Sequence, residues 1–166
     1  MILENIQQKI LKSDADALHL VSQWKNNHET VVFSNGCFDL LHPGHVIYLA
    51  KAAELGTKLI VAINTDTSVQ QLKGKNRPLL DENARCLMMA SLGFVDAVVL
   101  FDDDTPLRLI KLLLPNVLVK GKDYAIEEIA GHDVVLQNGG KVETIEIVPG
   151  YSTSAIEEKI LGRKGE

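Results

Sequence analysis

The sequence predicts an α/β fold, a doubly wound parallel sheet of five strands with helices on both faces. From Val31 onward, short runs rich in β-branched residues alternate with segments of helical periodicity. The run 59–63 is apolar throughout, as expected of a strand covered on both faces. The connecting loops are short. Strands that alternate with helices through short loops favour parallel pairing with crossover connections.

The boundaries of the elements follow from periodicity, caps and breakers. The expected strands cover 31–33, 59–63, 97–101, 117–119 and 142–148. The expected helices cover 43–55, 81–91, 105–115, a short stretch before Asn138, and a last one from Ser152 to about Gly162. Asp81 is a predicted N-cap, and Pro43 suits a first helical position. Residues 1–28 are expected to be a helical preface packed on a domain of residues 29–166.

Composition limits the classes of protein to which this chain can belong. With 166 residues, 46% of them hydrophobic, it has enough apolar material for one globular core. A formal net charge of −5 argues against a broad nucleic-acid surface. No signal peptide or membrane span is predicted. Cys37 and Cys86 form no pair motif, so we expect neither disulfide nor zinc site, and a cytoplasmic setting.

The loop after the first expected strand carries the strongest local signal. Ligands of a doubly wound sheet bind beyond the carboxyl ends of the strands. There, His42 is placed as an N-cap and Pro43 as the first helical residue, so the N–H groups of Gly44 and His45 point toward a bound anion. Both imidazoles can donate hydrogen bonds to phosphate oxygens. Two unrelated surface histidines are the alternative, which the cluster at a strand-to-helix switch disfavours.

Three other loops are expected at the same edge of the sheet. After the second strand, Lys73, Lys75 and Arg77 can neutralise phosphates from a flexible loop, unless they form only a solvated basic loop. Lys120 and Gly121 follow the fourth strand. The hydroxyl residues 152–154 follow Gly150 and favour a second phosphate site at a helix start, unless they are only caps.

Residues 36–45 resemble the G-x-F-D-x-x-H-x-G-H signature of the cytidylyltransferase-like nucleotidyltransferases, which have a Rossmann-like fold. The resemblance implies that His42 and His45 stabilise the α-phosphate and that Lys73 completes the catalytic set. The implied nucleotide-binding residues are Asn35, Gly36, Cys37, Phe38, His42, Gly44, His45, Lys120, Gly121, Ser152, Thr153 and Ser154. The implied substrate-binding residues are Asp39, Asp66, Lys73, Arg77, Arg85 and Asp123. Asp39 and Asp66 have the alternative of capping turns, and Arg85 is expected on the polar side of its helix.

A narrower resemblance covers nearly the whole chain. The segments 33–39, 72–78, 103–106, 118–124 and 128–131 are similar to adenylyltransferases of D-glycero-β-D-manno-heptose 1-phosphate. This implies transfer of AMP from ATP to that sugar phosphate, with Mg²⁺ as cofactor and pyrophosphate and ADP-heptose, a precursor of lipopolysaccharide core, as products. It also implies a homodimer with neither nucleic-acid nor membrane partners. Ile147 stands where the R-T-E-G-I-S-T-T motif of glycerol-phosphate cytidylyltransferases has Arg, which favours the adenylyl branch.

Two alternatives remain open from sequence. One is a cytidylyltransferase for another phosphorylated polyol or amino alcohol. The other is a nucleotide-sensing module that does not catalyse, which an intact pair of histidines disfavours. If the chain is an enzyme, we expect direct in-line attack by the sugar phosphate, because no Cys or Ser has an obvious general base beside it.

Overall fold

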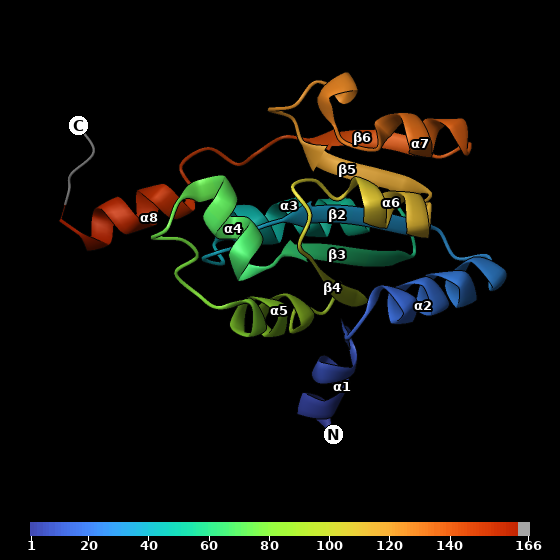
Figure 1. Cartoon of the computed structure of the whole chain (residues 1–166), viewed down its shortest axis with the longest axis horizontal. Coiled ribbons are helices and arrows are strands. Elements are labelled where there is room, and N and C mark those ends of the chain that lie inside the picture. The colour runs from blue at the N-terminus through green and yellow to red at the C-terminus, as the bar shows by residue number, and fades with distance from the viewer. Residues whose placement is uncertain (163–166) are drawn as a thin grey trace.

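A computed structural model describes residues 1–162 as a six-stranded parallel sheet in the order β1-β4-β3-β2-β5-β6 (Figure 1). Every adjacent pair of strands is parallel. The strands are β1 (Ile10–Leu11), β2 (Val31–Gly36), β3 (Lys58–Asn64), β4 (Ala97–Phe101), β5 (Val117–Gly121) and β6 (Lys141–Ile145). The parallel sheet predicted from the alternating pattern is therefore confirmed.

Helices cover both faces of this sheet. They are α1 (Ile2–Gln8), α2 (Asp14–Asn26), α3 (Pro43–Ala53), α4 (Asp66–Lys73), α5 (Glu82–Ala90), α6 (Leu107–Leu113), α7 (His132–Gln137) and α8 (Thr153–Ile160), with a 3₁₀ turn at Ile126–Glu128. One apolar cluster joins α2, α6 and α7 to the sheet, and the other joins α1, α3 and α5. Within residues 1–162, no helix is long and apolar enough to cross a membrane.

The alternation of side chains along β2 explains why its sequence is apolar throughout. Val31 and Phe33 lie in the cluster with α2 and α6, while Val32 lies in the cluster with α3 and α5. All three side chains are completely buried. Burying a side chain of this size stabilises the fold by roughly 1.5–3 kcal/mol. Two covered faces thus require apolar residues at successive positions rather than at alternate ones.

The strand order fixes where a ligand can bind. Without its first edge strand, the sheet runs β4-β3-β2-β5-β6, so the chain first moves outward on one side of β2 and then crosses to the other. Ser34 of β2 lies beside Val119 of β5, and the chain continues from β2 to β3 on one side of this pair and from β5 to β6 on the other. A crevice forms where such loops diverge, beyond the carboxyl ends of the strands.

The structure corrects the number of strands. Ile10 and Leu11, expected within a purely helical preface, form the edge strand β1 and pair with Val98 and Val99. Residues 1–28 therefore contribute to the sheet instead of only packing on it. The last strand ends at Ile145 and not at Val148. The last four residues of the expected domain, 163–166, lie outside the described part of the chain.

A second correction concerns the segment after β3, expected as a loop with basic residues near its end. Residues Asp66–Lys73 form helix α4, which begins at the N-cap Thr65, whose side chain accepts a hydrogen bond from Ser68 N. Ser68 and Val69 are its buried residues. Val69 and Leu72 are the only large apolar side chains among its eight residues, which is too few to establish a helical period from sequence.

Candidate active site

A pocket of about 440 Å³ opens beyond the carboxyl ends of the paired strands β2 and β5. Every residue predicted to bind nucleotide lines it, together with Lys73 and Asp123. The lining is Asn35, Gly36, Cys37, Phe38, His42, Gly44, His45, Tyr48, Lys73, Lys120, Gly121, Asp123, Tyr124, Ile147, Tyr151, Ser152, Thr153 and Ser154. Residues from the β2, β5 and β6 loops are thus gathered around one cavity.

His42 is held in one orientation by the start of α3. It is the N-cap, with extended backbone angles of φ −138° and ψ 165°, as predicted. Its Nδ1 accepts a hydrogen bond from the backbone N–H of His45 at 3.4 Å. Because Nδ1 is the acceptor, the proton of the neutral ring lies on Nε2. The ring stacks on that of His45, with centroids 3.7 Å apart and planes 20° apart.

Both histidines are held neutral in the absence of an anion. Burial lowers the pKa of His42. Burial and the adjacent His42 lower the pKa of His45 to about 4. A bound phosphate favours the charged form of an imidazole, so the pair can gain a proton when an anion enters.

Two glycines bring backbone and rings close together at the pocket floor. A Cβ on Gly36 would lie 3.0 Å from the Phe38 ring, whose edge contacts His45. A Cβ on Gly44 would lie 3.0 Å from the His42 ring and 3.2 Å from Cβ of Tyr151. Phe38 itself has a left-handed backbone, with φ 47°, a conformation that costs a non-glycine residue about 1–2 kcal/mol. The loop therefore keeps a strained backbone next to the histidines.

Two lysines supply positive charge from different elements. Lys73 is the last residue of α4, not part of a flexible loop, and its exposed side chain borders the pocket. Lys120 donates from Nζ to the carbonyl of Asn35 at 3.2 Å and lies 5.5 Å from the centroid of the Tyr124 ring. Burial lowers the pKa of Lys120. Oδ1 of Asn35 is buried without a hydrogen-bond partner among the described residues, so a ligand can donate to it.

The start of α8 forms another wall of the pocket. Ser152 is the N-cap, and its Oγ accepts from the N–H of Ala155 at 3.0 Å. The cap expected from sequence is therefore present. The N-termini of α3 and α8 both border the cavity, which favours a polyanionic ligand there.

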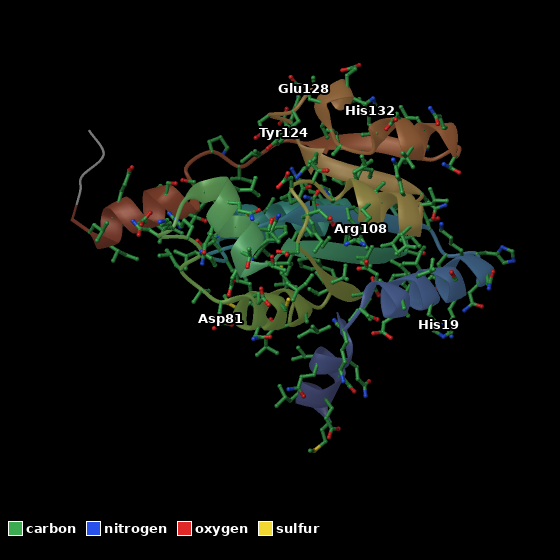
Figure 2. The ribbon with its side chains drawn as sticks, in the orientation of Figure 1. His19, Asp81, Arg108, Tyr124, Glu128 and His132 are labelled. Atoms are coloured by element: carbon green, nitrogen blue, oxygen red, sulfur yellow. The ribbon has the colours of Figure 1, made fainter. Side chains whose placement is uncertain are left out.

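Four residues of the lining were not predicted. They are Tyr48, Tyr124, Ile147 and Tyr151. Tyr48 donates to the carbonyl of Val119 at 3.1 Å, and burial raises its pKa to about 12, so it ties α3 to β5 as a neutral phenol. Its position three residues after His45 on the same helix face was the available signal. Figure 2 shows Tyr124 on the segment that follows β5. Ile147, Tyr124 and Tyr151 stay between 44% and 52% exposed.

Arg85 occupies a different place from the one expected. It was predicted on the polar side of its helix as a substrate ligand, but it is only 1% exposed. Its guanidinium donates to the carbonyl of Cys37 at 2.7 Å, to the carbonyl of Leu80 at 3.0 Å and to Asp66 at 2.8 Å. Arg85 and Asp66 do not line the pocket. They hold the loop that forms its floor.

Asp39 and Arg77 also lie outside the pocket lining. The Asp39 carboxylate is fully buried and accepts from Arg77 Nη1 at 2.9 Å and from the N–H groups of Leu79 and Leu80 at 2.7 and 3.1 Å. Burial alone raises the pKa of Asp39, but hydrogen bonds from Arg77 and the two backbone amides outweigh it and leave the pKa below its usual value. Asp39 therefore organises the loop as a buried anion.

The donor set does not form a resident metal site. Among residues 1–162, no group of three His, Cys, Asp or Glu side chains is arranged to hold a metal ion. The pocket lining contains one carboxylate, Asp123. Mg²⁺ commonly keeps several waters and binds phosphate oxygens together with one or two carboxylates. The residues present fit an ion that arrives with a polyphosphate.

Comparison with known proteins assigns this site to a family. A family model described as cytidylyltransferase-like matches residues 33–159, which include both histidines and the α8 wall. The chain is 54% identical over 149 residues to the "Bifunctional protein HldE" of Azorhizobium caulinodans, covering 90% of this chain and 31% of that protein. It is 54% identical over 143 residues to the protein of the same name from Citrifermentans bemidjiense, covering 86% and 29%. The chain thus spans less than a third of these relatives.

A solved structure has the same fold. The lipopolysaccharide core biosynthesis protein of Thermoplasma volcanium superposes with a TM-score of 0.59 and 28% sequence identity. The match covers 72% of this chain and 97% of the other. The matched region is therefore nearly the whole of that protein.

Proposed function

This chain belongs to the cytidylyltransferase-like family, and on that premise we propose that it is an adenylyltransferase for D-glycero-β-D-manno-heptose 1-phosphate. The proposed reaction joins AMP from ATP to the sugar phosphate and yields ADP-heptose and pyrophosphate. The 54% identity to bifunctional HldE proteins and the likeness to a lipopolysaccharide core biosynthesis protein support a heptose acceptor.

One observation carries the reaction class. The two stacked histidines, two lysines and two helix N-termini border one cavity at the switch point of a doubly wound sheet. A nucleoside triphosphate needs this combination of donors and positive potential along its phosphates. The absence of a paired nucleophile and base from the lining fits an acceptor that brings its own anionic oxygen.

The proposed chemical step is a direct displacement at phosphorus. An oxygen of the sugar 1-phosphate forms a bond to the α-phosphorus of ATP. The bond from that phosphorus to the bridging oxygen breaks, and pyrophosphate leaves with the electron pair. The acceptor oxygen is already deprotonated at neutral pH, so catalysis depends on alignment and on stabilising negative charge.

Residues of the lining have proposed roles in aligning the phosphates or stabilising their charge. Nε2–H of His42 donates to the α-phosphate, because Nδ1 already serves as the helix cap. His45, stacked on it, adds a second donor and can take up a proton as the anion enters. Lys73, at the end of α4, neutralises charge on the phosphates from the exposed side. Phe38 holds the His45 ring from its edge.

Mg²⁺ is the proposed cofactor and enters with ATP. It would shield the leaving phosphates, and Asp123 is the carboxylate in the lining that can contact it or its waters. The residues of the pocket lining would orient the phosphates of ATP.

The apolar rim supports adenine over cytosine. Ile147, 52% exposed, lies at the pocket where the cytidylyltransferases of glycerol phosphate have Arg. Tyr124 adds an aromatic face near Lys120. A larger purine gains more from apolar contact than a pyrimidine does.

The test is to identify the product. The purified protein is incubated with Mg²⁺, D-glycero-β-D-manno-heptose 1-phosphate and either ATP or CTP, and the nucleotide sugar is identified by mass spectrometry and ³¹P NMR. We expect ADP-heptose with ATP and at least tenfold less product with CTP, since one base-specific contact changes specificity by roughly this factor. A CDP-sugar as the preferred product would assign the chain to the cytidylyl branch. Nucleotide binding without any product would make it a sensing module.

A further inference from the structure

Helix α8 contributes no residue to either apolar cluster, and an ion pair connects it to the rest of the molecule. None of its residues is buried, although its first turn forms a wall of the pocket. In Figure 1 it lies at one end of the molecule, beyond the strands. Glu157, in its middle, forms an ion pair with Nη2 of Arg77.

The other nitrogen of the same guanidinium contacts Asp39, in the loop that forms the floor of the pocket. Nη1 of Arg77 donates to Asp39 at 2.9 Å, and the Asp39 carboxylate is fully buried. Two backbone N–H groups fix that carboxylate further, so the Asp39 end of the bridge is rigid. The Glu157 carboxylate is 36% exposed, so its end is reached by water.

Arg77 therefore connects two parts of the pocket, in addition to the close approach of Gly44 to Tyr151. Asp39 belongs to the loop that carries Phe38 and His42, while Glu157 belongs to the helix that carries residues 152–154. Arg77 also follows Lys73, at the end of α4, by four residues. A planar guanidinium can donate to two carboxylates at once in a fixed geometry, which an ammonium cannot do.

We propose that Arg77 is a positioning residue that latches α8 to the β2–α3 loop and so sets the binding geometry of the triphosphate, instead of contacting the acceptor. The inference rests on the proposed function of the pocket. Its basis is the bridge from buried Asp39 to Glu157, together with the absence of Arg77 from the pocket lining among the described residues. Once the latch is lost, the start of α8 no longer stays in register with the histidines.

The first variant to measure is Glu157→Gln, because it weakens the latch by removing its carboxylate charge and leaves the buried pair of Asp39 and Arg77 intact. We expect kcat/KM for ATP to fall about tenfold, mainly through KM, while KM for the sugar phosphate stays unchanged. Hydrogen exchange of the α8 amides should become faster. Glu158→Gln, one residue further on the same helix and exposed, is the matched control and should change neither quantity.

The second variant, Arg77→Lys, keeps a charge beside Asp39 and removes the two-sided geometry. It should reproduce Glu157→Gln. The double variant should lose about tenfold in kcat/KM for ATP, not the roughly 100-fold that two independent effects would give. Arg108→Gln is the control for removing an arginine. Arg108, on α6, pairs with Asp14 of α2 and with Asp103, well away from α8 (Figure 2).

Binding of a non-hydrolysable ATP analogue, followed by calorimetry, separates this inference from the proposed function. If the protein makes no ADP-heptose, weaker analogue binding and faster α8 exchange in Glu157→Gln still support the latch. The latch is wrong if Glu157→Gln binds the analogue and exchanges like the parent protein. It is also wrong if Arg77→Lys raises KM for the sugar phosphate alone, which would make Arg77 an acceptor ligand.

Discussion

There is a cavity at each end of the sheet, and the larger cavity is not the one that contains the stacked histidines. A cavity of about 680 Å³ lies at the amino ends of the strands, while the pocket with the histidines, at the carboxyl ends, measures about 440 Å³. Both are lined by polar residues, lysines and histidines. Size and composition alone therefore do not separate them.

The backbone differs between the two ends. At the carboxyl ends, α3 and α8 begin at the pocket, with N–H groups directed toward it. At the amino ends, α6 finishes with the left-handed residue Leu114, and Lys25 donates to the carbonyls of Leu113 and Leu114 at 2.8 and 2.6 Å. Lys25 thus donates to carbonyl groups at the end of α6 that have no partner within the helix.

The direction of the helices therefore determines which of the two cavities can bind an anion. In a parallel sheet with crossover helices, helix N-termini gather at one end and C-termini at the other. The positive potential of the N-termini favours phosphate at the carboxyl ends of the strands, and the negative potential at the amino ends disfavours it. Equivalent substitutions at the two ends should therefore have different effects.

The largest contrast is expected between two histidines. His45→Asn should lower kcat by roughly 10²–10³-fold, because a donor to the transition-state charge is lost from a buried position. His28→Asn, in the amino-end cavity, should leave kcat unchanged, since Asn also accepts the left-handed backbone of φ 60° found there. Initial rates of pyrophosphate release at saturating ATP and sugar phosphate measure both. Equal losses would mean that the comparison is wrong.

Glycines at the two ends give the next contrast. Gly44→Ala places a methyl group 3.0 Å from the His42 ring and should raise KM for ATP by about tenfold or more, without destabilising α3. Gly139→Ala has free space around it but a φ of 76°, so it should cost about 1 kcal/mol of stability and leave KM unchanged. Steady-state kinetics and urea unfolding distinguish the two. If Gly44→Ala lost only stability, close approach of the phosphate would not be its role.

Lysines should separate activity from stability in the same way. Lys73→Met should lower kcat/KM by about tenfold and leave the free energy of unfolding nearly unchanged, because the side chain is exposed. Lys25→Met should do the reverse, with a loss of about 1–3 kcal/mol of stability from the two carbonyls left without a donor. Thermal unfolding and pyrophosphate release are measured on the same preparations. An inactive but fully stable Lys25→Met would place function at the amino end.

The smallest expected effect is the uptake of a proton by His45 when ATP binds. The pKa of His45 is about 4 in the free protein, and a bound triphosphate raises it. Between these two values, ATP binding takes up less than one proton, so affinity should weaken as the pH rises through this window. Calorimetry in two buffers of different ionisation enthalpy measures the uptake. His45→Asn should abolish it, and an unchanged uptake would assign the proton to another group.

Much of the fold could be predicted from local patterns. The strands β2 to β5 are largely apolar because both their faces are covered, whereas β6 alternates exposed and buried residues. The caps His42, Asp81 and Ser152 mark helix starts through side-chain hydrogen bonds that need no tertiary context. The strand β1 was missed because Ile10 and Leu11 are too few to show a period. Their strand conformation depends on pairing with β4, which no local window contains.

The sequence predicted the site residues that belong to a local backbone motif. It did not predict the roles of charged residues that become buried in the fold. His42, Gly44 and His45 follow directly from a strand-to-helix turn, and they line the pocket. Asp39 and Arg85 are charged residues that a sequence places at the surface, yet Asp39 pairs with Arg77, 38 residues away, and Arg85 donates to the main chain of Cys37, 48 residues away. Only the folded arrangement shows that they support the loop.

One measurement tests most directly the claim that this pocket transfers AMP to a sugar phosphate in a single step. Labelled pyrophosphate is mixed with the protein, Mg²⁺ and ATP, with and without D-glycero-β-D-manno-heptose 1-phosphate, and label in ATP is followed. The account predicts label in ATP only when the sugar phosphate is present, because pyrophosphate can return only through ADP-heptose. Label without the sugar phosphate would reveal an adenylylated protein and contradict direct transfer, and no label in either mixture would contradict the proposed reaction.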